Sequence, residues 1–314
     1  MGRDTRSGVP LYWMACANAT LMASTYIKLL LMALFWGGTF IAGRVLAQSV
    51  GPFSGAFLRF AVASLCLSAI MLRNGKPLSR PSGKHLLLLL LMGMTGIFSY
   101  NVFFLKGLKL IEAGRASIII ACNPIFIALM SAVFFRERLN GLKATGIVVS
   151  VSGALTAIAR GDFSALLSGG FGWGELYLFG CVASWVAYSL FGKAVMSSLS
   201  PLVAVTYSAV AGTVCLLPAA MMEDLRGAAA YPLDAWVSIF YLGFFGTVVG
   251  FVWYYQGIQR IGPVRAGLFI NFVPVFALLL AFFILKEPVT PSLLIGAALV
   301  SSGVYLTTLG SRRA

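Results

Sequence analysis

Apolar residues occur in long runs along this chain, and short segments rich in polar residues, Gly and Pro separate them. The runs are about 20 residues long, which is the length that a helix needs to cross the hydrocarbon core of a bilayer. The pattern predicts ten helices, at about 26–46, 53–72, 85–106, 113–135, 142–159, 175–193, 202–222, 235–256, 266–285 and 292–309. The predicted fold class is an all-α polytopic membrane protein.

The chain contains one unit twice. The segment Phe35–Val45 recurs as Ser184–Ala194, 149 residues later, with Trp36 on Trp185 and a basic residue eight positions further on in each copy. Residues then recur at a spacing of 150, in the pairs Gly107/Gly257, Arg115/Arg265, Pro124/Pro274, Glu137/Glu287, Gly146/Gly296 and Gly153/Gly303. So many matches at two adjacent spacings indicate an internal duplication.

The duplication predicts an N-terminal extension (1–25), a first five-helix repeat (26–160), an outer linker (161–174) and a second five-helix repeat (175–314). Because five is an odd number, the second repeat enters the membrane from the opposite side, so the repeats are inverted. Connections on one side hold fifteen Lys and Arg residues and those on the other hold seven. The positive-inside rule therefore predicts a multi-pass inner-membrane protein with both termini in the cytoplasm. Inverted repeats are typical of secondary transporters, which bind solutes between the repeats near the membrane midplane.

Composition excludes several classes. Apolar residues make up 60% of the chain and charged residues only 10%, against about 25% charged in a soluble domain. The net charge of +14 comes from basic residues in the connections, where membrane orientation explains it, so no nucleic-acid partner is expected. With His85 as the only histidine and scattered cysteines, no metal site or disulfide is expected. No hydrolase, metalloprotease or P-loop motif is present, so we expect neither an enzyme nor a cofactor.

The acidic residues bear on energy coupling. All nine fall at predicted helix ends or in connections, whereas proton-driven carriers usually keep an ionisable group within the membrane. The sequence therefore favours facilitated efflux.

The duplicated motifs support a family resemblance. The W-x7-R/K helix, the Gly-x7-Arg turn before a proline-containing helix and the closing Lys286-Glu287-Pro288 resemble the ten-helix EamA-type branch of the drug/metabolite transporter superfamily, over residues 26–309. The resemblance implies a two-basket, ten-helix fold with a central cavity, and export of small metabolites, with amino acids, including aromatic ones, among them. Nucleotide-sugar and drug carriers of the same superfamily, and a lipid scramblase, remain alternatives.

Aromatic and amide side chains at mid-helix positions are the candidate substrate site. Interfacial tryptophans usually lie at helix ends, so the central Trp36 and Trp185 indicate either core packing or aromatic walls around a solute. The predicted substrate-binding residues are Trp36, Thr39, Tyr100, Asn101, Asn123, Trp185, Tyr188, Trp253, Tyr254 and Asn271. Such a lining suits a neutral or zwitterionic small molecule.

Prolines and arginines add two further predictions. Pro124 and Pro274 should kink their helices and free backbone carbonyls in the preceding turn, and the nearby Asn123 and Asn271 either satisfy these carbonyls or bind the solute. Arg59, inside a predicted helix, extends to the membrane interface or meets a substrate carboxylate. Arg115 and Arg265, at helix starts, are candidate gate residues.

We expect four acidic residues at the predicted outer side to act locally. Glu112 is a candidate acidic partner of Arg115, and the alternative is that Arg115 is a simple interfacial anchor. Glu287 should pair with neighbouring basic residues, and Glu223-Asp224 should be a solvated turn.

Overall fold

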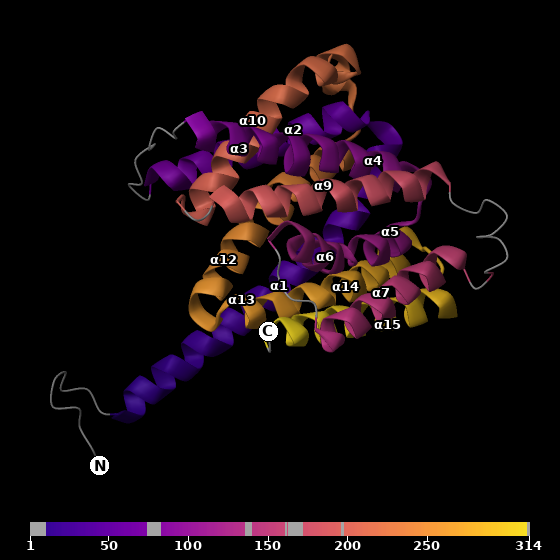
Figure 1. Cartoon of the computed structure of the whole chain (residues 1–314). Coiled ribbons are helices and arrows are strands. Elements are labelled where there is room, and N and C mark those ends of the chain that lie inside the picture. Colours follow the sequence, from indigo (N-terminus) through magenta and orange to yellow (C-terminus); the bar gives the residue numbers. More distant parts are fainter. Residues whose placement is uncertain are drawn as a thin grey trace.

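Ten helical spans form the protein, as the hydrophobic pattern predicts. The computed structural model describes residues 11–73, 83–135, 140–160, 162, 172–195 and 198–312, and these contain no β-strand. The spans are Met22–Ser49, Pro52–Arg73, Gly83–Leu110, Ala113–Phe134, Gly141–Ala159, Trp173–Val195, Pro201–Met222, Leu233–Ile261, Arg265–Leu285 and Pro291–Gly310. The fold class is thus confirmed, with five spans in each repeat (Figure 1).

Six spans are continuous helices. They are α1 (Leu11–Ser49), α2 (Pro52–Arg73), α7 (Gly141–Ala159), α9 (Trp173–Val195), α10 (Pro201–Met222) and α15 (Pro291–Arg312). The first helix begins 15 residues earlier than the predicted residue 26. A short 3-10 helix, η2 (Leu225–Ala230), follows α10.

The third and eighth spans each contain a π-helical segment. The third comprises α3 (Gly83–Met92), η1 (Gly93–Ser99) and α4 (Tyr100–Leu110), and the eighth comprises α11 (Leu233–Phe240), η3 (Tyr241–Val249) and α12 (Gly250–Ile261). The first π-helix begins at Gly93 and ends at residue 99, and the second begins at Tyr241 and ends at residue 249, so they overlap at equivalent positions of the two repeats. A π-helical turn leaves backbone carbonyls without their usual partners, and such turns are frequent at functional sites.

The fourth and ninth spans are interrupted just before their prolines. The fourth comprises α5 (Ala113–Ile120) and α6 (Asn123–Phe135), and the ninth comprises α13 (Pro263–Leu268), η4 (Phe269–Asn271), α14 (Phe272–Leu280) and η5 (Ala281–Leu285). A proline ring clashes with the carbonyl four residues earlier, here that of Ile120 or Ile270. Those positions coincide with the end of α5 and with the 3-10 segment.

Equivalent helices of the two repeats meet in two places. The Ser64 hydroxyl on α2 lies 3.0 Å from the Thr213 hydroxyl on α10, and these positions are 149 residues apart. The helices α7 and α15 run side by side (Figure 1) and cross where Gly146 faces Gly303 and Gly153 faces Gly296. A Cβ atom at any of these glycines would lie within 3.0 Å of the other helix's backbone, so only glycine permits this approach.

Replacing Gly303 by alanine should therefore lower the thermal stability of the protein. Its Cβ would lie 2.5 Å from the Gly146 carbonyl oxygen, and overpacking of this kind costs about 1–3 kcal/mol. Thermal unfolding in detergent measures the effect. Gly141→Ala at the start of α7 is the control, because its Cβ would meet no atom within 4 Å. Equal melting temperatures for the two variants would contradict the close crossing.

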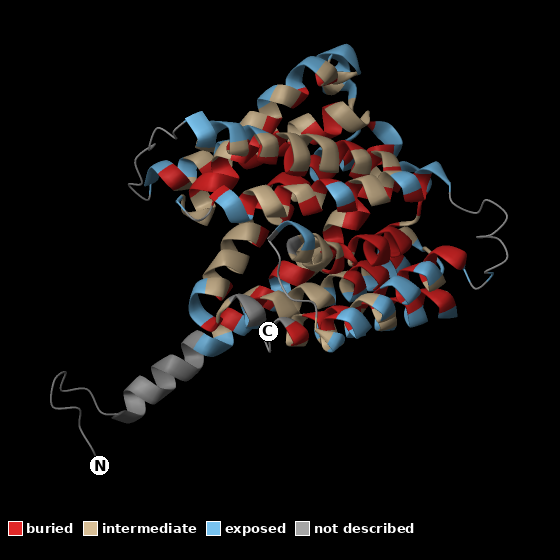
Figure 2. Ribbon diagram, viewed as in Figure 1, coloured by how far each residue is buried: buried red, intermediate tan, exposed pale blue. Residues whose placement is uncertain are grey.

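The two ends of the bundle differ in how tightly they are packed. All eight residues of α5 are buried, whereas at the equivalent positions of α13 and η4 Arg265 is exposed and residues 267–270 are half-buried. Figure 2 shows α5 as buried along its length. We call the end of the bundle with the connections at 50–51, 111–112, 160–172, 223–232 and 286–290 the locked end. The terminal end, where the first span begins and the last span ends, is the more loosely packed of the two.

Candidate functional site

Five aromatic side chains from both repeats meet at mid-span. The ring of Trp36 lies 5.5 Å from those of Phe251 and Tyr254, and the ring of Trp185 lies 5.2 Å from that of Tyr100 and 6.5 Å from that of Phe251. These distances are typical of favourable aromatic pairs. All five are half-buried, so each retains surface that the protein does not cover. We call Trp36, Tyr100, Trp185, Phe251 and Tyr254 the aromatic cluster.

The cluster combines predicted residues with one that the sequence analysis missed. Phe251 joins the two tryptophans, but a phenylalanine in an apolar helix gives no signal of such a role. Tyr188, which was predicted, packs its ring 5.1 Å from that of Trp185 and is buried. Trp253 was also predicted, yet its ring lies beside Phe35, at 5.7 Å, outside the cluster.

The π-helices position the cluster through their unpaired carbonyls. The Trp36 Nε1–H donates to the Gly246 carbonyl in η3, at 2.9 Å. At the equivalent position of η1, the Gly96 carbonyl accepts from the Asn101 amide, at 3.2 Å. Either glycine lets a side chain of the opposite repeat approach, since a Cβ would clash with Tyr188 at Gly96 and with Thr39 at Gly246.

The two tryptophans differ in their hydrogen bonding. Trp36 is tied to Gly246, and the hydroxyl of Thr39 donates to the Trp36 carbonyl at 2.6 Å. The Trp185 indole N–H has no hydrogen-bond partner among the described residues, although its ring is well packed. It can therefore donate to a bound solute.

The asparagines next to the kinks lie at the interruptions of their spans. Asn123 begins α6, is buried, and its amide oxygen has no hydrogen-bond partner in the part of the chain that the structure describes. Asn271 is half-buried at the end of η4. Neither satisfies the carbonyl that its proline frees, so both amides are available to a ligand.

Arg59 turns into the bundle and does not extend to the membrane interface. It is buried, and its Nη1 donates to the Asn101 side-chain oxygen at 2.9 Å. Its Nη2 makes longer contacts, 3.3 Å to the Thr247 hydroxyl and 3.4 Å to the Leu242 carbonyl. The guanidinium thus bridges α2 and α4 of the first repeat to η3 of the second.

Carboxylates of the second repeat hold the locked end together. Arg115 pairs with Glu175 at 2.6 Å, both side chains being 7% exposed, so the expected pairing with Glu112 is wrong. Glu287 accepts from the backbone N–H groups of Ala113 and Gly114, at 2.9 and 3.1 Å, and not from the neighbouring bases that we expected. A carboxylate at a helix N-terminus accepts hydrogen bonds from unpaired N–H groups and interacts favourably with the positive end of the helix dipole.

The Glu223-Asp224 turn makes an equivalent contact with α2 and is not merely solvated. Glu223 accepts from the N–H groups of Phe53 and Ser54, both at 2.9 Å, and Asp224 accepts from that of Gly51 at 2.9 Å. Burial acts to raise the pKa of Asp224, but hydrogen bonds from Ser54 and Gly51 outweigh it and hold the pKa below its usual value.

The terminal end carries weaker contacts between the repeats. Arg265, the equivalent of Arg115, is exposed and makes no ion pair with a described residue. The Arg260 guanidinium donates to the Thr25 hydroxyl at 3.1 Å, and Lys28 lies 3.5 Å from the Gln256 side-chain oxygen. Glu137, the equivalent of Glu287, lies outside the described residues.

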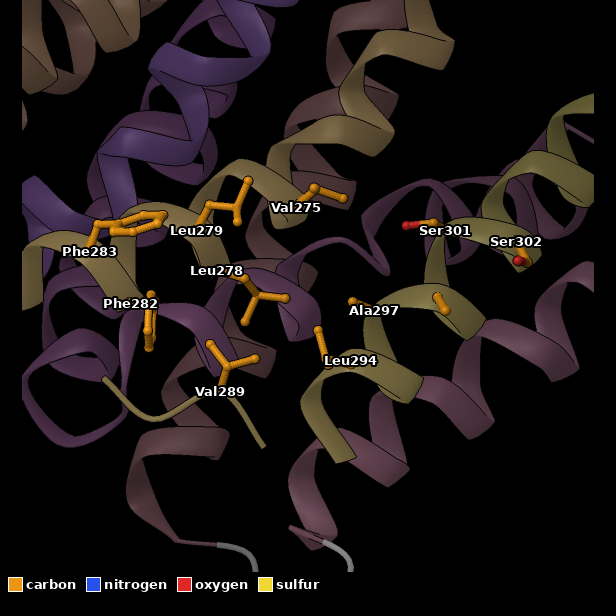
Figure 3. A pocket seen from close by; sticks show the side chains of 11 residues that line it. Val275, Leu278, Leu279, Phe282, Phe283, Val289, Leu294, Ala297, Ser301 and Ser302 are labelled. Carbon is orange, nitrogen blue, oxygen red and sulfur yellow. The ribbon is translucent and has the colours of Figure 1, made fainter. Parts of the chain in front are cut away.

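An apolar groove lies away from the aromatic cluster. It occupies about 650 Å³ between α14–η5 and α15 and is lined by exposed side chains such as Val275, Leu279 and Phe283, with Ser301 and Ser302 (Figure 3). None of the predicted site residues lines it. Exposed apolar side chains on spanning helices face the acyl chains of a bilayer, so this groove belongs to the lipid-facing surface.

Comparisons with known proteins agree with this architecture. A sequence model of the EamA-like transporter family matches residues 23–159 and again residues 172–309. A "probable terminal-alkyne amino-acid exporter" of Streptantibioticus cattleyicolor is 32% identical, over 91% of this chain and 94% of that protein. A "probable amino-acid metabolite efflux pump" of Escherichia coli is 27% identical, over 90% and 94%. The uncharacterized transporter YyaM of Bacillus subtilis is 28% identical, over 91% and 93%.

A solved crystal structure shares the fold. It superposes with a TM-score of 0.61 at 23% sequence identity, over 93% of this chain and 98% of that one.

Proposed function

Because this chain belongs to the EamA-like transporter family, we propose that it exports small neutral or zwitterionic metabolites, amino acids above all, by alternating access between its two repeats. The observation that carries the proposal is the aromatic cluster, which draws on both repeats near mid-span. Transporters built from inverted repeats bind their solutes at this position. Two relatives named as exporters of amino acids or their metabolites support the substrate class.

The cluster's chemistry fits an amino acid. Aromatic faces bind apolar side chains and attract an ammonium group through cation–π contacts. The Trp185 N–H supplies a hydrogen-bond donor in the cluster. At the interruption of the fourth span, the Asn123 amide oxygen is an acceptor without a partner among the described residues. We place the protein in the cell inner membrane with the terminal end in the cytoplasm, so that the loosely packed end admits solute from inside the cell.

Counterflow in proteoliposomes tests the function. Purified protein is reconstituted with a panel of labelled amino acids, nucleobases and nucleotide sugars, and a parallel sample carries fluorescent phospholipid. We expect saturable exchange of amino acids. Nucleotide-sugar exchange or lipid scrambling, without amino-acid exchange, would replace the proposal by one of those activities.

Amino-acid flux should need no imposed proton gradient. All acidic side chains among the described residues lie at helix ends or in connections, so no carboxylate there is placed to carry a proton through mid-membrane. Flux is measured with an imposed pH difference and again after a protonophore has collapsed that difference. Strict dependence on the gradient would refute facilitated export.

A further inference from the structure

Arg59 is a buried cation without an acidic partner in the described part of the chain. Arg59 is 7% exposed, and its hydrogen-bond partners are all neutral: Asn101, Thr247 and the Leu242 carbonyl. Arg115, by contrast, is paired with Glu175. The Nε–H of Arg59 is buried and has no hydrogen-bond partner among the described residues.

Such a group is costly for a membrane protein. An unpaired charge removed from water costs several kcal/mol, and ionisable groups within spans usually mark substrate or ion pathways.

The fold itself does not require this polar group. At the equivalent positions of the other repeat, Ser208 replaces Arg59, Phe251 replaces Asn101 and Ile97 replaces Thr247. The same crossing of helices therefore packs without a charge, so packing alone does not explain Arg59.

The guanidinium lies next to the aromatic cluster on its locked-end side. At about 1.5 Å per helical residue, Arg59 is about 10 Å from the start of α2 and Tyr100 about 15 Å from the end of α4. Its partner Asn101 directly follows Tyr100 of the cluster. Its partner Thr247 directly follows Gly246, whose carbonyl holds Trp36.

One edge of the guanidinium is suited to a carboxylate. Nη1 is held by Asn101, which fixes the plane of the group, while the Nε–H is unpaired and Nη2 makes only the two long contacts. The Nε and Nη2 donors point the same way and match the two oxygens of a carboxylate.

We propose that Arg59 is the carboxylate-recognition group of the transport path, with Asn101 as its positioning residue. This proposal rests on the amino-acid transport proposed above and narrows it. A solute moving from the aromatic cluster toward the locked end replaces the long neutral contacts of Nη2 with its own carboxylate. The protein thus selects α-amino acids against the amides and amines that share their side chains and ammonium group.

Competition during counterflow tests this selection. The probes are labelled L-phenylalanine and labelled L-leucine, each challenged with its own carboxamide and with its decarboxylated amine. We expect the wild type to bind either competitor at least about 100-fold more weakly than the amino acid, which corresponds to about 2.7 kcal/mol. R59Q should reduce this ratio at least tenfold. R59K should keep a preference at reduced affinity, because a lysine supplies charge without bidentate geometry.

The control is R44Q. It removes a half-buried arginine elsewhere in the first repeat, whose guanidinium donates to the Leu108 carbonyl. It should leave the ratio unchanged. If R59Q gives no monodisperse protein, the R59K variant is the test. An R59K protein with the wild-type affinity for the amino acid and the wild-type ratio of affinities would overturn the proposal. Equal competition by amino acid and amide in the wild type would also overturn it while leaving amino-acid transport intact. Absence of flux for every amino acid would remove both proposals.

Discussion

Replacing Trp185 by alanine is expected to lower amino-acid flux at least tenfold while the protein remains folded. The ring makes three aromatic contacts, to Tyr100, Tyr188 and Phe251, and contacts of this kind contribute about 0.5–1.5 kcal/mol each. In W185A, a solute that packs against the exposed face of the ring would lose both this packing contact and the hydrogen bond from the indole N–H. Flux is measured by counterflow at matched amounts of reconstituted protein.

The comparison with two further variants separates binding from folding. Trp173 lies on the same helix, α9, but is 70% exposed, so W173A should leave flux near the wild-type value. W185F keeps a ring and removes the N–H, and we expect a loss smaller than that of W185A. Wild-type flux in W185A would show that the aromatic cluster is not the binding site.

Trp36 should give a different pattern because its N–H is already used within the protein. Its bond to the Gly246 carbonyl satisfies a group that the π-helix leaves unpaired, so W36A removes a structural contact as well as a ring. We expect W36A to lower both the melting temperature and the flux, whereas W185A lowers mainly the flux. The difference follows from hydrogen bonding and could not be read from the matched positions of the two residues in the sequence.

The spans and the repeat could be predicted because they depend on local properties. Apolar length sets each span, and a proline interrupts a helix through its own ring, so the breaks before Pro124 and Pro274 follow from residue type alone. The match between Trp36 and Trp185 likewise needs only the duplicated sequence.

The details of the site depend on tertiary contacts that no local pattern encodes. Trp253 and Tyr254 are neighbours in the sequence, but successive residues of a helix point about 100° apart, and only Tyr254 faces the cluster. Glu112 is three residues from Arg115, yet the ion pair forms with Glu175, which the packing of α9 against α5 brings near. The cross-repeat contacts of Glu223 and Glu287 were missed for the same reason.

The asymmetry between the ends of the bundle indicates which step of a transport cycle this structure represents. The repeats share one pattern of spans, but α5 is fully buried and its equivalent is not. In inverted repeats, exchange of the two conformations gives the opposite access state. Under the alternating access proposed above, the structure corresponds to a state closed at the locked end, and opening that end would break the contacts of Glu175, Glu223 and Glu287.

Removing Glu175 should open the locked end. In E175A the buried Arg115 loses its counter-ion, and breaking a buried pair in this way costs about 3–5 kcal/mol, enough to shift a two-state equilibrium by about two to four orders of magnitude. We expect hydrogen exchange of residues 113–120 to accelerate at least tenfold. Exchange at residues 263–271, already the less buried of the two segments, should change little.

A double-mutant cycle identifies the charge pair as the cause. In the R115A/E175A variant no unpaired charge remains, so its exchange at residues 113–120 should be slower than in E175A. E112Q alters the other acid near Arg115 and should behave as the wild type. If E175A and E112Q exchanged alike, the ion pair would not be what holds this end closed, and the backbone contacts of Glu287 and Glu223 would have to carry the closure alone. Faster exchange in E175A together with its recovery in the double variant would instead make the Arg115–Glu175 pair the contact that export must break at every cycle.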